Sequence, residues 1–397
     1  MDAVKLLLIA TLASLLLGQL IKIPLFSQSG SISITDLLVT TTIIIFFCNS
    51  FFTKKKLLFP KQIILPAVFF ALSALFSLVL VIPNFSLSEI IVSLSFLIRF
   101  FIYFLLAVVI YNTVKKPQVL PWFNFILIIG ASFAVLGLMQ YITFQDLSSL
   151  AHYGWDPHQR RIVSTFLDPN FSGVFFGMTT TLATILYLYK KKNSYLVLTG
   201  IGFIALVLTF SRSSYIAFLA MMLTVGLFKS PKTFFIVLFL FITLFSLVGR
   251  VRSRVIGAIT LDETSKARIE SWQNAIIIFK DNPIFGIGFN SYRFSQVKYG
   301  FFTVDDPLGG HSGSGADSSI LLVAATTGII GTSFFLFFIL STLVVLSKKV
   351  KKSPSHLATF STFLGLLIHS QFVNSLFFPQ VIIFLWYMLG LTLKDDS

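Results

Sequence analysis

The sequence predicts an all-α, polytopic integral membrane protein with about twelve spanning helices. Its 397 residues are 56% hydrophobic and 11% charged, and they include 47 phenylalanines, a composition too apolar for a water-soluble chain of this length. Uncharged runs of the roughly 20 residues that cross a bilayer recur along the whole chain. Lysine clusters fall between these runs on alternate loops, as expected of a chain that crosses repeatedly.

Each expected span is an apolar run bounded by charged or loop-forming residues. In chain order the predicted spans are 4–21, 32–52, 62–82, 90–111, 119–142, 171–189, 195–210, 213–228, 234–249, 317–346, 356–376 and 379–393. The first run follows a short basic start but shows no cleavage site before Lys22, so we expect it to be retained. The seventh and eighth spans are short, and a re-entrant pair is the alternative there.

The chain shows no internal repeat and no separate soluble region, so we expect residues 1–397 to form a single membrane domain. The lone cysteine, Cys48, lies in an apolar run and excludes an intramolecular disulfide and a cysteine-rich metal site. We therefore expect no cofactor that depends on cysteine ligands.

The lysine clusters set the expected orientation. They are Lys54–Lys56, Lys115–Lys116, Lys190–Lys192, Lys229 with Lys232, and Lys348–Lys352. Positive charge favours the cytoplasmic side, so both termini are expected there. Topology and anionic membrane lipids account for these clusters, and the net charge of +15 needs no nucleic-acid partner.

The nine arginines are distributed differently from the lysines. In this topology none lies in a cytoplasmic loop: Arg99 is within the fourth span, and the outward loops hold Arg160, Arg161, Arg212, Arg250, Arg252, Arg254, Arg268 and Arg293. The guanidinium group binds phosphate and carboxylate in a bidentate manner. An anionic ligand at the outer face is one explanation. Pairing with loop carboxylates, such as Asp156, Asp168, Asp262, Glu263 and Glu270, is the alternative.

Two outward loops are long, about 143–170 and 250–316, and long loops of distinctive composition are usually functional. In the second, SKARIESWQNAIIIFKDNP predicts an amphipathic helix lying on the membrane, capped by Thr264 or Ser265 and ended by Pro283. Arg268 and Trp272 share one face of it, where they bind a lipid phosphate or anchor the helix. We expect the following GIGFNSYR to serve turn geometry.

Four motifs together resemble the O-antigen ligase and O-antigen polymerase superfamily. They are RRIVSTFLDPNFSG, LTFSRSSYIAF, ARIESWQNAIIIFKDNPIFGIGFNSYR, and a loop histidine ahead of DSSILLVAATTGIIG. The resemblance runs from about Arg160 to the C-terminus. It implies an all-helical glycosyltransferase of the bacterial cytoplasmic (inner) membrane, needing no metal, with its active site on the outer, periplasmic side. The implied donor is an undecaprenyl-diphosphate-linked oligosaccharide.

The acceptor remains open between a glycan and a lipid. Many ligases of this superfamily have an asparagine directly after the loop histidine, whereas here His311 is followed by SGSGADSS. We therefore favour a polymerase of O-antigen or exopolysaccharide, with a chain-length regulator as a possible partner. The alternatives are an O-antigen ligase acting on lipid A core or another surface acceptor and, from another class, a transporter or lipid-linked glycan flippase.

The proposed reaction assigns chemistry to the loop residues. Leaving diphosphate needs cations, and the candidates are Arg161, Arg212, Arg252, Arg254, Arg268 and Arg293, with Arg160 and Trp272 as further candidates. The acceptor hydroxyl needs a base, and His311 is the first candidate, with Asp317 orienting it or acting instead. His152 and His158 are weaker candidates, and His356 and His369 are expected to pack in the core.

Three further polar residues have two explanations each. Asp168 and Asn170 in the DPN sequence bind the acceptor or cap the sixth span. Arg99 lies near mid-membrane, where an unpaired charge costs on the order of 2.5–3.5 kcal/mol. It is therefore expected to bond to Asp36 or to reach the carrier diphosphate from below.

Overall fold

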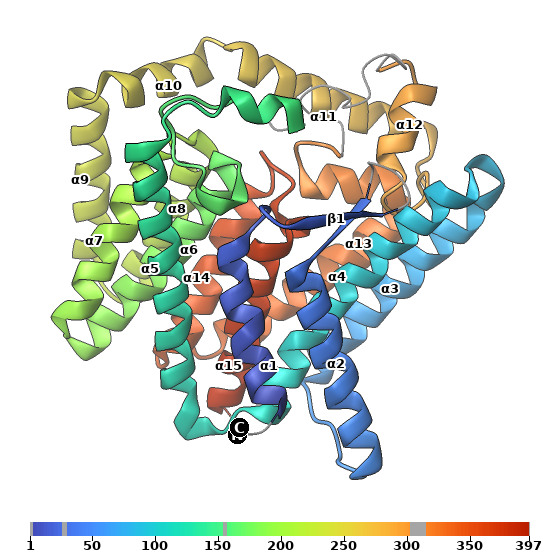
Figure 1. Ribbon diagram of the computed structural model, residues 1–397, viewed down its shortest axis with the longest axis horizontal. Helices are drawn as coiled ribbons and strands as arrows, with labels where there is room; N and C mark the ends of the chain where they lie inside the picture. Colours follow the sequence, from blue (N-terminus) through green and yellow to red (C-terminus); the bar gives the residue numbers. More distant parts are fainter. Residues whose placement is uncertain (1–2, 26–29, 154–156, 302–314, 397) are drawn as a thin grey trace.

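The protein is a bundle of helices with a helical layer across one end (Figure 1). The computed structural model describes residues 3–25, 30–153, 157–301 and 315–396. It is 79% helical. The α-helices among the described residues are α1 Ala3–Ser14, α2 Ile34–Phe52, α3 Lys61–Leu80, α4 Leu87–Thr113, α5 Val119–Thr143, α6 Pro169–Lys190, α7 Asn193–Leu208, α8 Arg212–Phe228, α9 Pro231–Leu247, α10 Gly249–Ile259, α11 Glu263–Asp281, α12 Tyr292–Lys298, α13 Ser319–Ser347, α14 Pro354–His369 and α15 Pro379–Asp396.

A helix occupies each of the twelve predicted spans, but twelve crossings are not confirmed. By length and composition, six helices of the described chain are long and apolar enough to cross a membrane, or seven if the bent unit of α9 with α10–α11 is one span. The helices at the first, seventh and eighth spans are shorter than these six; they cover Ala3–Leu17, Asn193–Leu208 and Arg212–Phe228. The seventh and eighth helices are as short as predicted, whereas the first ends at Leu17 and not at the predicted residue 21.

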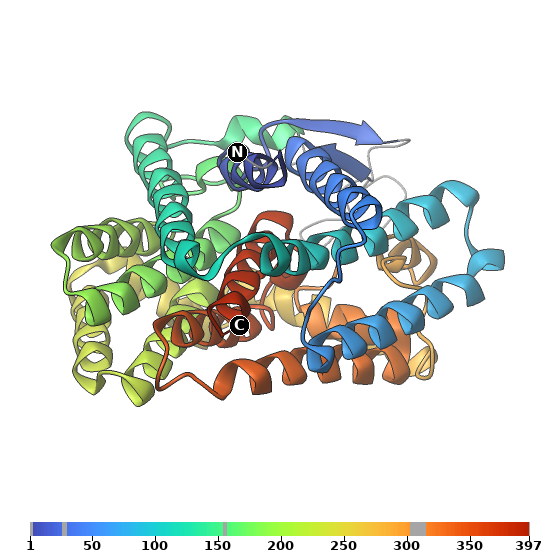
Figure 2. The same cartoon turned by 90° about the horizontal axis from the view of Figure 1, so that it is seen from below.

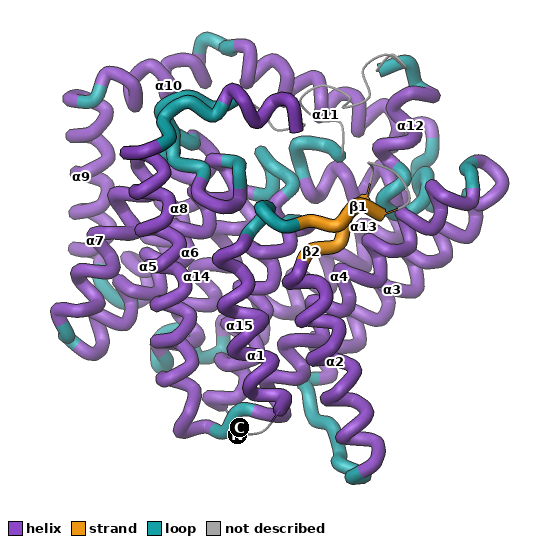
Figure 3. The backbone as a smooth tube through the Cα atoms, viewed as in Figure 1, coloured by secondary structure: helices purple, strands orange, loops and turns teal. Residues whose placement is uncertain are grey.

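The expectation of a purely helical fold needs one correction. After α1 the chain forms a two-stranded antiparallel hairpin, β1 Lys22–Leu25 and β2 Gly30–Ser33, shown in orange in Figure 3. Arg99 of α4 donates to the carbonyl of Ser31 in β2 and forms an ion pair with Asp36 of α2 at 3.0 Å. The expected Arg99–Asp36 bond is confirmed, and the same guanidinium fixes the hairpin to the bundle.

Helix α15 lies among the other helices of the bundle (Figure 2). Its Trp386 and Tyr387 are buried; the Trp386 ring meets Phe104 of α4 edge-on, and the Tyr387 hydroxyl donates to the carbonyl of Leu8 at 2.8 Å. Aromatic contacts of this kind supply geometry as well as buried apolar area. They join the two ends of the sequence into one core.

The long loop 250–316 contains the helices of the end layer. Helix α9 and the following α10–α11 segment are bent by 96° at Val248, so α10 and α11 run across the bundle rather than along it (Figure 1). In the same view the C-terminus and the connection after α2 lie at the opposite end. The arginines of α10 and the lysine-rich connection after α2 are therefore at opposite ends of the bundle.

A break in α13 holds the far end of α11 in place. Gly328 has a φ of 62° inside α13, and a Cβ there would overlap the backbone of Ile284 and Phe285. The freed Ile329 amide donates to the Pro283 carbonyl at 2.8 Å. Gly286 also has a positive φ against α13, so the glycines after α11 serve turn geometry and close packing, as expected.

Candidate functional site

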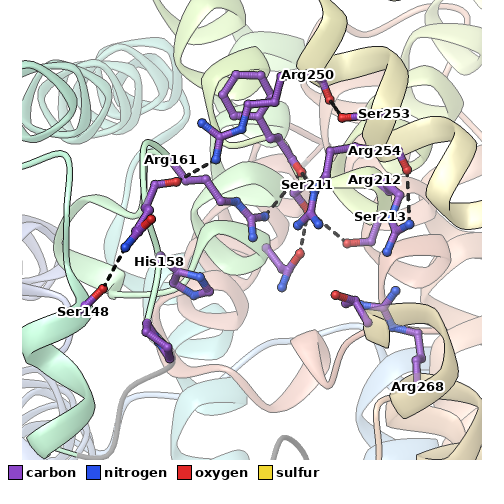
Figure 4. Close-up of a pocket in the computed structure, with 15 residues that line it drawn as sticks. Ser148, His158, Arg161, Ser211, Arg212, Ser213, Arg250, Ser253, Arg254 and Arg268 are labelled. Carbon is purple, nitrogen blue, oxygen red and sulfur yellow. Dashed lines mark hydrogen bonds between the residues drawn. The ribbon is translucent and has the colours of Figure 1, made fainter. Parts of the chain in front are cut away.

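A cavity of about 800 Å³ opens where the loop 144–168 meets the α7–α8 turn and helices α10 and α11. Figure 4 shows Arg161, Arg212 and Arg268 arranged around it. Five arginines from four chain segments line this space, together with small polar residues. The lining residues are Ser148, Pro157, His158, Gln159, Arg161, Asn170, Phe210, Ser211, Arg212, Ser213, Arg250, Ser253, Arg254, Thr264 and Arg268.

The turn between α7 and α8 forms one wall. The last carbonyls of a helix have no partner within it and carry partial negative charge. Here the Thr209 and Phe210 carbonyls accept from Arg161 at 2.8 and 3.4 Å, and the Phe210 carbonyl accepts from Arg254 Nε at 3.4 Å. Phe210 has a φ of 49°, unusual for a residue with a side chain. The tight turn thus binds two guanidinium groups through neutral acceptors.

Helix α8 begins at the cavity, with Ser211, Arg212 and Ser213 all in its lining. Ser211 caps the helix by accepting from the Ser214 amide at 3.4 Å. The amino end of a helix carries partial positive charge and exposed amide donors. This end therefore adds to the positive field of the arginines.

Arg212 has a carboxylate partner, Asp262. Its two terminal nitrogens donate to Asp262 at 2.9 and 3.0 Å, and Nη1 also donates to the Arg254 carbonyl at 3.1 Å. The expected pairing of an arginine with Asp262 is confirmed. Asp262 also caps α11 by accepting from the Ser265 amide at 3.0 Å, so the prediction that Thr264 or Ser265 is the cap is wrong.

Arg250 and Arg254 lie four residues apart on α10 and both line the cavity, whereas Arg252 between them is exposed and does not. Arg250 donates to the carbonyls of Gln159 and Arg160 at 2.6 and 2.5 Å and lies over the Phe210 ring at 4.5 Å. Sequence reasoning did not select Arg250, because residues 250–316 were treated as a loop. A helical period of 3.6 residues in GRVRSR is the signal that separates Arg252 from its neighbours.

The cavity is strongly electropositive. Of the residues that line it within the described chain, none is Asp or Glu. Burial, followed by the charge of Arg254, lowers the pKa of Arg161 to about 9. Burial also lowers the pKa of Arg254 and of Arg268. Since these groups stay protonated at neutral pH, their lowered pKa values show that positive charge is crowded and partly desolvated. A bound anion relieves that cost.

Asp317 lies beside Arg268 at the start of α13. Its amide donates to Ser271 Oγ at 2.9 Å, and its carbonyl accepts from Trp272 Nε1 at 3.0 Å, so α11 holds it on two sides. The negative charge of Asp317 acts on Arg268, which lines the cavity. The structure thus brings Asp317, Arg268 and Trp272 together. His311 lies outside the described residues.

The remaining candidates divide between the cavity and other places. Arg160 and Arg252 are exposed and outside the lining. Arg293 of α12 is at another site, where it and Arg99 each lie 4.9 Å from the Phe96 ring. Burial, followed by the charge of Arg99, lowers the pKa of Arg293 to about 10. The four-arginine set Arg161, Arg212, Arg254 and Arg268 is therefore the part of the prediction that the structure gathers in one cavity.

Asp168 and Asn170 have separate roles at the start of α6. Asp168 caps the helix by accepting from the amides of Asn170 and Phe171 at 2.6 and 3.0 Å, as the capping alternative expected. Asn170 lines the cavity and accepts from Ser211 Oγ at 2.7 Å. His158 also lines the cavity, and the side chain of His152 lies outside the described residues. His356 and His369 are buried, as expected for packing histidines.

Nothing in the described part of the chain gathers three or more His, Cys, Asp or Glu side chains in a way that could hold a metal ion. The cations that face the cavity are arginines. The site is therefore suited to binding an anion through guanidinium groups, with hydroxyl and amide side chains beside them.

The fold is that of a helical membrane protein with an arginine-lined cavity at the end formed by its two long loops. Residues 195–336 match the family model described as O-antigen ligase, which supports the O-antigen ligase and polymerase superfamily. The matched region includes Arg212, Arg250, Arg254, Arg268 and Asp317. It indicates glycan transfer of the ligase or polymerase type in an inner-membrane protein. No curated protein matches the chain.

Proposed function

We propose that the protein is a membrane glycosyltransferase that uses an undecaprenyl-diphosphate-linked glycan as donor at the outer face of the cytoplasmic membrane. The observation that carries the proposal is the cavity with five arginines and no lining carboxylate among the described residues. Its dimensions suit a diphosphate with the first sugar, since ligand sites of this kind measure roughly 300–1,000 Å³. The polyprenyl chain extends from the cavity into the bilayer.

In this proposal the arginines stabilise the leaving group. As the acceptor oxygen attacks the anomeric carbon, the bond from that carbon to the diphosphate oxygen breaks, and its electron pair leaves with the diphosphate. Arg161, Arg212 and Arg268 neutralise the charge that develops, which is the role of preorganised cations in a partly dry site. We propose that this happens without a metal ion.

The proton of the acceptor hydroxyl passes to a base, and we propose His311 or Asp317. Asp317 is supported by its position, because its neighbour Arg268 is part of the cavity wall. In an in-line displacement the acceptor attacks the face of the sugar opposite the diphosphate, so the base belongs beyond the arginines, and Asp317, which is not itself part of the cavity lining, fits that place. Trp272 and Ser271, which bond to the Asp317 backbone, hold it there.

We favour a polymerase, in which the acceptor is a second lipid-linked repeat unit. The test supplies the purified protein in nanodiscs with lipid-linked repeat units alone. The polymerase proposal expects longer lipid-linked chains. No product until a lipid A core or another acceptor is added would make the protein a ligase, the activity named by the matched family.

The transporter and flippase alternative is tested separately. Liposomes that contain the protein and a fluorescent lipid-linked glycan on one leaflet are assayed for translocation without an acceptor. The proposal expects no translocation above protein-free liposomes. Movement across the bilayer without any new glycosidic bond would contradict it.

A further inference from the structure

His369, at the end of α14, lies behind the cavity wall and was expected only to pack in the core. Its side chain is fully buried, and its Nε2 lies 3.2 Å from Ser213 Oγ and 3.4 Å from Ser214 Oγ. Ser213 lines the cavity, whereas His369 does not. The imidazole therefore reaches the cavity through one hydroxyl group.

Ser211, Ser213 and Ser214 form a short hydrogen-bond chain with Asn170. Ser211 Oγ donates to the Asn170 side chain at 2.7 Å, and Ser214 Oγ donates to the Asn170 carbonyl at 3.0 Å. Ser214 Oγ is also placed to donate to Ser211 Oγ at 2.9 Å, and Ser213 is the member that lines the cavity and contacts both Ser211 and the imidazole. Ser213 Oγ lies 3.1 Å from Ser211 Oγ and 3.2 Å from the imidazole.

The tautomer of His369 decides what Ser213 offers the cavity. If Nε2 carries the proton, it donates to Ser213, whose own hydrogen then bonds to Ser211 Oγ when the cavity is empty and turns to a ligand when one is bound. If Nε2 is bare, Ser213 donates to the imidazole and turns a lone pair toward the cavity, which repels an anion. The imidazole is fully buried, and the positive charge of Arg268 acts on it as well, so a second positive charge there is costly and the ring is neutral.

We propose that His369 is a positioning residue for the donor: its neutral imidazole donates from Nε2 to Ser213, so that the Ser213 hydroxyl donates to a phosphate oxygen in the arginine-lined cavity. The inference rests on the proposed function, because it needs a diphosphate in that cavity. Hydroxyl donors complement the guanidinium groups by binding oxygen without adding charge to a cavity that is already crowded with it.

The test measures the affinity of the full-length protein in nanodiscs for inorganic pyrophosphate, as a competitor of the lipid-linked donor. His369→Phe should weaken pyrophosphate binding about tenfold to a hundredfold, the effect of losing a hydrogen bond to a charged group. His369→Gln, whose amide supplies a donor near the Nε2 position, should restore most of the affinity. The double variant with Ser213→Ala should bind no more weakly than Ser213→Ala alone, because both changes remove the same bond.

His356 provides the matched control, since it is a second buried histidine on α14 and pairs with Asp396 at the opposite end. His356→Phe should lower thermal stability without changing the affinity for pyrophosphate. Wild-type protein that does not bind pyrophosphate would refute the proposed function itself. Wild-type binding that His369→Phe leaves unchanged, or that falls equally in His356→Phe and His369→Phe, would overturn the role of His369 alone.

Discussion

Replacing Arg254 and Arg252 separately by lysine compares a cavity arginine with an exposed one on the same helix. Arg254 lines the cavity and is anchored by its Nε bond to the Phe210 carbonyl, whereas Arg252, two residues before it, is exposed. Lysine keeps the charge of either residue but loses the planar fork. The pair therefore separates bidentate recognition in the cavity from general positive charge at the membrane surface.

The expected magnitude follows from the bond that lysine cannot make. A hydrogen bond to a charged group contributes about 1.5–3 kcal/mol, which corresponds to roughly 10- to 100-fold. Arg254→Lys should slow formation of lipid-linked chains by that factor, and Arg252→Lys should leave it within about twofold. Arg161→Lys, Arg212→Lys and Arg268→Lys should resemble Arg254→Lys at unchanged expression.

The assay follows elongation of radiolabelled repeat units by purified protein, and inhibition by pyrophosphate is measured in parallel. If pyrophosphate inhibits Arg254→Lys less strongly than the wild type, and this variant also turns over more slowly, the lost interaction is one with the diphosphate. Equal losses in both variants, or wild-type turnover in Arg254→Lys, would refute the view that this cavity recognises the leaving group.

Three further predictions concern the support of the site and its base. Gly328→Ala should destabilise the protein by more than the ~1–2 kcal/mol cost of a left-handed residue, because the new Cβ overlaps neighbouring backbone, and its thermal midpoint should fall. Gly200→Ala, where a Cβ has nothing within 4 Å, should leave the midpoint unchanged. Equal midpoints for the two variants would contradict the account of the α13 break. The pKa of Asp262 is lowered because hydrogen bonds from Arg212 and Ser265 outweigh burial, which raises it. Its stabilising effect is therefore present above its unfolded pKa of about 4 and lost as pH falls further. Asp262→Asn should lower the midpoint at pH 7 and much less at pH 3, and a pH-independent difference would count against the ion pair. If His311 is the base, His311→Ala should slow turnover about 10²- to 10⁴-fold, and the variant should no longer lose activity as the pH falls below about 6–7. A larger loss in Asp317→Asn would assign the base to Asp317. Full activity of both variants would remove both residues from the mechanism.

Much of the fold was predictable because its signals are local. Apolar runs of sufficient length predicted a helix at every expected span, and the cost of a charge near mid-membrane predicted the bond from Arg99 to Asp36. The hairpin after α1 was missed, since residues 22–31 were read as a connection and residues 32–33 as the start of the second span. Its strands are held by the Ser31 carbonyl bond to Arg99, a contact that adjacent residues do not reveal.

The sequence predicted the chemistry of the site better than it predicted which residues form the site. Arginine segregation pointed to an anion, and four of the six proposed diphosphate ligands share one cavity. Arg250 was missed and Arg252 was included, because helical phase was not applied to GRVRSR. The role of the α7–α8 turn was also hidden, since it depends on the carbonyls of Thr209 and Phe210 rather than on side chains.

The most direct test is a structure of the protein in nanodiscs with a non-hydrolysable lipid-linked donor bound. The account predicts that the diphosphate lies in the cavity among Arg161, Arg212, Arg254 and Arg268, with the anomeric carbon on the side of Asp317. A diphosphate bound elsewhere, for example beside Arg99 and Arg293, would contradict the assignment of this cavity as the donor site.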